Sequence, residues 1–188
     1  MQTNWDYCLR ATLLEEGGND DDPHDHGGRT SRGIIQREYD AYRKHKHLPT
    51  KDVWTASDAE IRDIYSISFW EPYCPKLPTG IDMEYFDMAV NGGFHESTLL
   101  LQRSLGVKAD GHIGIITLHA IEVANPVDVV HKFAAYREHF YRSLAQFPRY
   151  GHDWLARTKR IATAGINLIS LHPDHTLSLD TSDESLKA

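Results

Sequence analysis

Residues 16–30 are the most informative stretch of this chain, and they read Glu16-Gly17-Gly18-Asn19-Asp20-Asp21-Asp22-Pro23-His24-Asp25-His26-Gly27-Gly28-Arg29-Thr30. The residues before it, 3–16, have the periodicity of a helix. One narrow stripe of that helix carries Trp5, Leu9, Thr12 and Glu16, flanked by Cys8 and Leu13. Glu16 is therefore predicted to face the protein, with Glu15 nearer the flank. The glycines after Glu16 are predicted to end the helix.

The predicted position of Glu16 has chemical consequences. A carboxylate on an apolar face costs free energy when it is ionised, so such groups are usually neutral, paired or used in chemistry. The negative end of the helix dipole also disfavours the charged form. Both effects favour the protonated state that a general acid needs at neutral pH. An alternative stays open, in which the stem of Glu16 packs inward while its head reaches water or an arginine.

The rest of the chain predicts an all-α protein, because helical periodicity recurs and alternating strand patterns are nearly absent. Ser57 and Glu60 have the spacing of a capping box, and Asn125-Pro126 is a typical helix start. A proline-rich turn is expected around residues 72–78, and residues 172–188 are expected to form a mobile tail. Helices are predicted at residues 33–45, from 57 through Phe69, at 81–90, at 99–105, from 125 through Leu144, and over a last segment from Trp154 to Leu168.

Composition excludes several classes of function. A formal charge of -7 over 188 residues argues against a nucleic-acid partner, which requires clustered basic side chains. The N-terminus lacks the pattern of a signal peptide, and no apolar run is long enough for a membrane span. We therefore expect synthesis in the cytoplasm and no membrane insertion. Cys8 and Cys74 are too few for a disulfide scaffold and are expected to stay as thiols, Cys8 as a small buried apolar residue.

The Asp- and His-rich loop contains residue types that bind metal ions. A calcium-binding EF-hand needs glycine at the sixth loop position and glutamate at the twelfth. Counted from Asp20, those positions hold Asp25 and Ser31, so the pattern fails. Zinc could use His24 and His26, but two residues so close on a loop are a weak constraint. No required metal and no cofactor is expected.

The same loop suits a sugar polymer. Glycines at 17, 18, 27 and 28 allow a sugar ring to approach the backbone, and polar side chains at 25 and 29–31 can bond hydroxyl or N-acetyl groups. Glycoside cleavage normally needs a second carboxylate. Asp25 is the first candidate for this role and Asp22 the second, while a purely structural role of Asp25 in the loop remains open.

The opening motif resembles that of glycoside hydrolase family 108, the lysozyme-like N-acetylmuramidases of phage lysis cassettes and bacterial secretion-associated loci. The resemblance is carried by Glu16-Gly17-Gly18, Asp22-Pro23, Asp25-His26-Gly27-Gly28, Thr30 and Gly33-Ile34. It continues through Phe69-Trp70-Glu71-Pro72-Tyr73, Leu77-Pro78, Phe86-Asp87-Met88-Ala89-Val90-Asn91-Gly92-Gly93, Leu101-Gln102, Leu105-Gly106-Val107, Asp110-Gly111-His112-Ile113-Gly114 and Thr117. The chain departs from the family at Asn19, where tyrosine is usual, and at Ile115, where a turn residue such as proline is commoner.

This resemblance implies a lysozyme-like fold of about eight helices. It implies a catalytic segment at residues 1–80, a helical peptidoglycan-binding segment at 81–171 packed on it, and a tail at 172–188. Glu16 would be the catalytic acid, with Asp25 as its partner, and the substrate contacts would include Gly27, Gly28, Arg29, Thr30 and Asn91. Asn91 also has an alternative role as a helix cap near the cleft.

The expected function is hydrolysis of the β-1,4 bond between N-acetylmuramic acid and N-acetylglucosamine in bacterial peptidoglycan. The protein would be a monomeric phage or prophage endolysin that another factor releases to the cell wall. Two alternatives remain: a non-catalytic peptidoglycan-binding or structural module, and a lytic transglycosylase that uses the same acid. The twelve histidines are predicted to be solvated surface residues without an essential catalytic role.

Overall fold

The structure is a computed structural model that describes residues 4–16, 18–20 and 29–172. It is all-α and lysozyme-like, as expected, and about 75% of the described residues are helical and 3% are in strands. The helices are α1 (Trp5–Glu16), α2 (Gln36–His45), α3 (Asp58–Tyr65), α4 (Ile81–Leu105), α5 (Ile115–Val123), α6 (Pro126–Ser143) and α7 (Phe147–Leu171). The strands are β1 (Asn19–Asp20), β2 (Thr30–Ser31) and β3 (Ile34–Ile35), with short helical turns at Val53–Thr55, Ser66–Trp70 and Cys74–Lys76.

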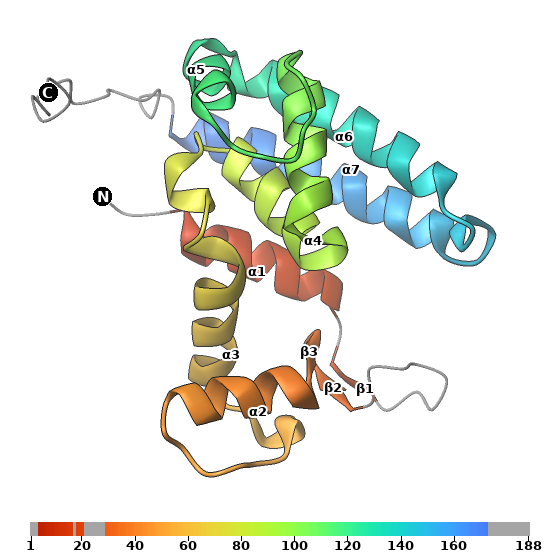
Figure 1. Cartoon of the computed structure of the whole chain (residues 1–188). Helices are drawn as coiled ribbons and strands as arrows, with labels where there is room; N and C mark the ends of the chain where they lie inside the picture. The colour runs from red at the N-terminus through yellow and green to blue at the C-terminus, as the bar shows by residue number, and fades with distance from the viewer. Residues whose placement is uncertain (1–3, 17, 21–28, 173–188) are drawn as a thin grey trace, which may run out of the picture.

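The elements form two lobes joined by α3 (Figure 1). The larger lobe contains α4 to α7, in which α6 packs against both α4 and α7. The smaller lobe contains α2 and an antiparallel sheet of order β1-β2-β3. Helix α1 lies along the larger lobe and contacts α4 and α7, and its C-terminal end points towards the sheet (Figure 1). The last residue of α1 is thus placed where the two lobes meet.

The caps predicted from sequence are confirmed. The Ser57 hydroxyl accepts a hydrogen bond from the backbone N–H of Glu60, whose carboxylate accepts one from the Ser57 N–H at 3.0 Å. At the start of α6, the Asn125 side chain accepts a hydrogen bond from the Val127 N–H at 2.9 Å. Both residues therefore satisfy N–H groups that a helix start leaves without partners.

Three elements differ from the expectation. The two helices expected at 81–90 and 99–105 belong to one run, α4, broken at Gly93, whose φ of 84° and ψ of 163° are not helical. Residues 34–35 form β3, so α2 begins at Gln36 rather than at residue 33. Helix α5 was not anticipated. The strands have two residues each, which is too short to produce a recognisable alternation in sequence.

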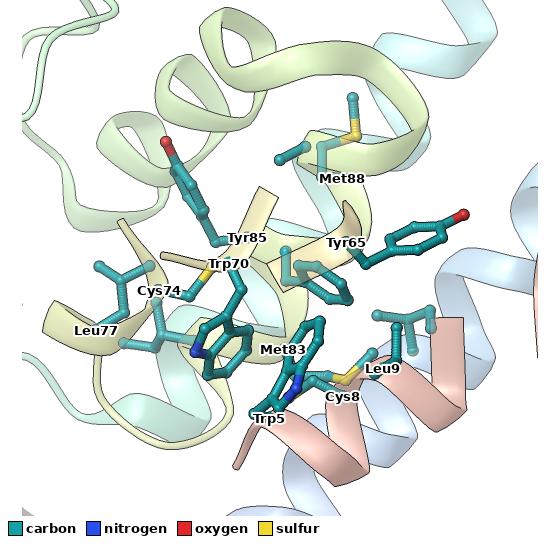
Figure 2. Packing of buried hydrophobic residues seen from close by; sticks show 14 of the residues in the cluster. Trp5, Cys8, Leu9, Tyr65, Trp70, Cys74, Leu77, Met83, Tyr85 and Met88 are labelled. Atoms are coloured by element: carbon teal, nitrogen blue, oxygen red, sulfur yellow. The ribbon is translucent and has the colours of Figure 1, made fainter. Parts of the chain in front are cut away.

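The core attaches α1 firmly to the rest of the protein. Trp5 of α1 packs against Trp70 at 5.4 Å and Phe86 at 5.6 Å between ring centroids. Figure 2 shows Trp5, Cys8 and Leu9 of α1 directed into this cluster. Cys8 and Cys74 are free and buried, as expected, and burial raises the pKa of both thiols. This packing fixes the helix that carries Glu16.

The predicted tail at 172–188 lies almost wholly outside the described residues. Among the residues that are described, no helix is long and apolar enough to cross a membrane.

Candidate active site

Glu16 is the last residue of α1 and faces the turn between β2 and β3. Its side chain is 16% exposed, so it faces the protein as predicted. The turn contains Gly33, whose φ is +80°. A Cβ at Gly33 would lie 2.7 Å from Glu16 Oε2 and 2.6 Å from the Tyr65 hydroxyl oxygen. Only glycine therefore allows the turn to come this close to the carboxylate.

Tyr65 of α3 holds the same turn from the other side. Its hydroxyl donates a hydrogen bond to the carbonyl oxygen of Arg32 at 2.8 Å. Burial, reinforced by the charge of Glu16, raises the pKa of Tyr65 well above its ordinary value. The hydroxyl thus remains a hydrogen-bond donor at any physiological pH, and it ties the small sheet to the helix that joins the lobes.

Arg157 of α7 binds the Glu16 carboxylate. Its Nη2 donates to Glu16 Oε1 at 2.7 Å and also to Asp87 Oδ1 at 2.8 Å. Its Nε donates to Asp87 Oδ2 at 3.1 Å. Although burial disfavours the charge of Arg157, Asp87 and Glu16 raise its pKa, so the guanidinium stays charged. The head of Glu16 therefore reaches an arginine, as in the alternative that the sequence left open.

Asp87 of α4 anchors this arginine from within the core. It is fully buried and also accepts hydrogen bonds from Arg137 Nη2 at 2.6 Å and from the Thr12 hydroxyl at 3.1 Å. Burial alone would raise the pKa of Asp87, but the two arginines outweigh it and lower the pKa. The carboxylate is therefore ionised, and its contacts connect α1, α4, α6 and α7.

A third carboxyl group, Glu84, lies one turn earlier on α4. Both of its oxygens are buried and have no hydrogen-bond partner among the described residues, and Oε2 lies 3.9 Å from Arg137 Nη1. Burial raises the pKa of Glu84 to about 8. Glu84 is thus neutral at pH 7, and Asp87 is the ionised carboxylate that lies between Arg137 and Arg157.

Glu15, which is expected nearer the flank of α1, has a side chain that is 10% exposed. Arg160 of α7 covers it, donating from Nε and Nη2 to the two carboxylate oxygens at 2.7 and 2.6 Å. The Glu15–Arg160 pair lies beside Glu16–Arg157 and joins the same two helices, but Arg160 is largely exposed.

The predicted loop residues are only partly described. Asp22, His24, Asp25, His26, Gly27 and Gly28 lie outside the described residues. Arg29 pairs with Asp52 at 2.6 Å and lies over the Trp54 ring at 4.4 Å. The carbonyl oxygen of Thr30 accepts a hydrogen bond from the Trp54 indole at 3.0 Å. Arg29 and Thr30 therefore attach the sheet to the turn at 53–55, and their contact with substrate stays a prediction.

Asn91 is exposed on α4, two residues before the break at Gly93. Its Oδ1 accepts a hydrogen bond from the Tyr141 hydroxyl at 2.6 Å, and that hydroxyl accepts one from Arg137 Nε at 3.0 Å. Asn91 is thereby connected to the buried ion pairs. Its role in substrate binding stays a prediction.

Sequence reasoning gave no role to Asp87 and did not single out Arg157. A usable signal existed at Arg137, which occupies an apolar position in the period of its helix. A charged residue on such a face implies a buried partner. Within the described residues, no group of three or more His, Cys, Asp or Glu side chains could hold a metal ion.

An acidic residue at a helix end, a small sheet facing it and a helical lobe behind it define the class of lysozyme-like glycoside hydrolases. The family model described as glycosyl hydrolase 108 matches residues 9–93 of the chain. Solved structures that resemble the chain include that of SagA from Brucella abortus, with 25% sequence identity and a TM-score of 0.76. The match covers 88% of this chain and 95% of SagA. No curated protein matches at a significant level. Together these similarities support a peptidoglycan hydrolase.

Proposed function

We propose that the protein is an N-acetylmuramidase that hydrolyses the β-1,4 bond between N-acetylmuramic acid and N-acetylglucosamine, with Glu16 as general acid. One observation carries the choice of Glu16. Its carboxylate ends α1, lies against a turn that only glycine can form, and is held by a buried arginine. An acid so placed can meet a bound sugar from one side while its charge is stabilised from the other.

The reaction follows from these contacts. Protonated Glu16 donates its proton to the glycosidic oxygen as the bond from that oxygen to the anomeric carbon breaks. Glu16 becomes a carboxylate, which Arg157 Nη2, at 2.7 Å, stabilises. A water molecule attacks the anomeric carbon and loses its proton to a base.

The second carboxylate is proposed to be Asp25, acting as base towards the water in an inverting reaction. Gly27, Gly28, Arg29, Thr30 and Asn91 are proposed as contacts to the glycan. Proton NMR of the first product tests the stereochemistry, because an inverting enzyme releases the α-anomer and a retaining enzyme the β-anomer. If Asp25→Asn retained full activity, Asp25 would not be the base.

The biological setting is also a proposal. A monomeric enzyme that another factor releases to the wall fits a phage or prophage endolysin. The helical segment at 81–171 would contribute binding to peptidoglycan. Sedimentation of the purified protein with intact walls, with and without Glu16→Gln, separates binding from cleavage.

The decisive experiment is mass spectrometry of the soluble products after digestion of purified peptidoglycan. Wild type is compared with Glu16→Gln and with Glu15→Gln, which removes the neighbouring carboxylate of the same helix. Reducing muropeptides from wild type and Glu15→Gln, but not from Glu16→Gln, are expected. Anhydro products would identify a lytic transglycosylase. No products from any of the three would favour a binding module.

A further inference from the structure

We propose that Asp87 and Arg157 are positioning residues, through which the core of the larger lobe sets both the orientation of Glu16 and the pH at which it carries its proton. The proposal rests on the function proposed above. It gives a role in the reaction to α7, a helix that begins well beyond residue 93, where the family match ends.

The geometry shows two carboxylates that share one guanidinium nitrogen. Arg157 Nη2 donates to Glu16 at 2.7 Å and to Asp87 at 2.8 Å, while Nε donates to Asp87. Asp87 therefore receives two hydrogen bonds from Arg157 and Glu16 receives one. Because Asp87 offsets much of the charge of Arg157, the attraction that Glu16 experiences is weaker than that of an undivided arginine.

The neighbouring pair on the same helices provides the contrast. Arg160 turns both Nε and Nη2 to the two oxygens of Glu15. Glu15 is therefore held by both branches of one guanidinium. Arg157 instead gives its Nε to Asp87. The difference between the two pairs lies in Asp87, which faces Arg157 from α4.

Asp87 cannot move to follow Glu16. It is fully buried, and Arg137 of α6 and Thr12 of α1 hold it from two further sides. Thr12 lies one helical turn before Glu16, so the helix that carries the acid is attached to its own anchor. A bidentate contact then fixes the plane of the Arg157 guanidinium, and hence the direction from which Glu16 Oε1 is bound.

The charged and titratable groups around Glu16 come from several elements. Arg157 faces it from α7 with Asp87 behind, Tyr65 approaches from α3, and the Glu15–Arg160 pair lies beside it. Tyr65 is neutral over the working range of pH, and Glu15 and Arg160 compensate each other. Asp87 and Arg157 are therefore the two groups whose substitution tests the charge that Glu16 experiences.

The expected effects of two substitutions have opposite signs. Asp87→Asn leaves Arg157 without its counter-charge, so Arg157 stabilises ionised Glu16 more strongly. The basic limb of the profile of kcat against pH then moves to lower pH, by about 1 pH unit. Arg157→Met removes the positive charge and moves the same limb to higher pH. Because the oriented contact is lost, kcat also falls, on the order of tenfold or more, with a smaller change in KM.

The experiment measures kcat and KM on purified peptidoglycan across pH for wild type and both variants. Arg160→Met is the matched control, because it breaks the adjacent pair between the same helices, and its profile should follow that of wild type. Arg157→Lys keeps the positive charge but lacks the two-pronged guanidinium. Compared with Arg157→Met, it should therefore return the basic limb of the pH profile towards its wild-type position without restoring kcat. Shifts of equal sign, or no shift, in Asp87→Asn and Arg157→Met would overturn the proposal.

Asp87→Asn is expected to fold, because Glu84, whose Oε2 lies 3.9 Å from Arg137 Nη1, can lose its proton and become the counter-charge of Arg137 once Asp87 is replaced. If Asp87→Asn does not fold, it can be combined with Arg137→Leu, which removes both members of the Asp87–Arg137 ion pair. Arg157 then also lacks the charge of Asp87, as in the single variant. The Arg157 variants test the proposal independently of either.

A second measurement does not depend on activity. Thermal unfolding is recorded for wild type, Glu16→Gln, Asp87→Asn and the double variant. Glu16 and Asp87 both bind Arg157, so their substitutions should not be additive. Glu16→Gln should lower the unfolding temperature more in the Asp87→Asn background than in wild type. Arg160→Met should change the unfolding temperature equally in wild type and in Asp87→Asn. If the effects of the two substitutions on stability are not additive but the wild-type protein has no activity, the proposed muramidase function is wrong and the sharing of Arg157 stands. If the protein is active but the two effects are additive, only the positioning role of Asp87 and Arg157 is wrong.

Discussion

Glu16 and Asp87, which come from helices α1 and α4, accept hydrogen bonds from the same nitrogen atom of Arg157, at 2.7 and 2.8 Å. One carboxylate is fully buried and the other is at the boundary between the lobes. This arrangement couples the core to the surface at which sugar is expected to bind. Four predictions follow from the surroundings of this contact, each with its own measurement.

Gly33→Ala is expected to reduce both stability and activity. The alanine Cβ would lie within 3 Å of Glu16 Oε2 and the Tyr65 hydroxyl, at a φ that disfavours alanine. We expect a loss of about 1–3 kcal/mol in the free energy of unfolding and a larger relative loss in kcat, because the acid must move. Gly114→Ala, at a position with nothing within 4 Å and a φ of -102°, is the control. Equal effects of the two substitutions on kcat would contradict this role of Gly33.

Glu84→Gln is expected to stabilise the protein increasingly as pH rises. Burial raises the pKa of folded Glu84 from 4.5 to about 8. Between these values the unfolded chain releases a proton that the folded chain keeps. The free energy of unfolding therefore falls as pH rises, and the loss is complete above pH 8. Urea unfolding at pH 5 and pH 8 should show the advantage of Glu84→Gln growing by a few kcal/mol. An advantage that does not vary with pH would mean that Glu84 is ionised in the folded protein.

Arg137→Met is expected to destabilise the protein strongly. Arg137 is fully buried and donates to Asp87, so its loss leaves part of a buried negative charge uncompensated. Removal of one partner from a buried ion pair costs about 3–5 kcal/mol. Arg142→Met, at an exposed position of the same helix, serves as the control and should change stability by less than about 1 kcal/mol. Chemical unfolding of both variants at pH 7 measures the difference.

Asn91→Ala tests the predicted contact with substrate. If Asn91 binds the glycan, its replacement raises KM by about tenfold, the effect of one lost hydrogen bond to a sugar. Tyr141→Phe removes the internal hydrogen bond to Asn91 and leaves the amide in place. We expect a smaller rise in KM for Tyr141→Phe. Identical kinetics of the two variants would reduce Asn91 to a structural partner of Tyr141.

Local signals in the sequence predicted much of the fold. Ser57 and Glu60 form the expected capping box, and Asn125 caps α6, because caps depend on residues only a few positions apart. The inward direction of Glu16 follows from helical spacing in the same way. Residues 34–35 could not be recognised as a strand, because two residues carry no period and the helical pattern that follows extended over them.

The arginine at the acid could not be predicted by such means. Arg157 is 141 residues from Glu16, and their contact depends on how α1 and α7 pack. No spacing rule connects residues so far apart. The position of Arg137 on an apolar stripe of its helix implies a buried partner, but only the fold identifies that partner as Asp87. Local propensities thus determine the helices, and their packing determines the site.

The location of Arg157 on α7 has a practical consequence for engineering this enzyme. A chimaera that joins residues 9–93 to unrelated C-terminal helices would retain the acid and its glycine turn. It would lose the guanidinium that binds the acid, and Asp87 would remain as a buried negative charge without either arginine. The smallest unit that can be transferred with its chemistry intact therefore extends from α1 through α7.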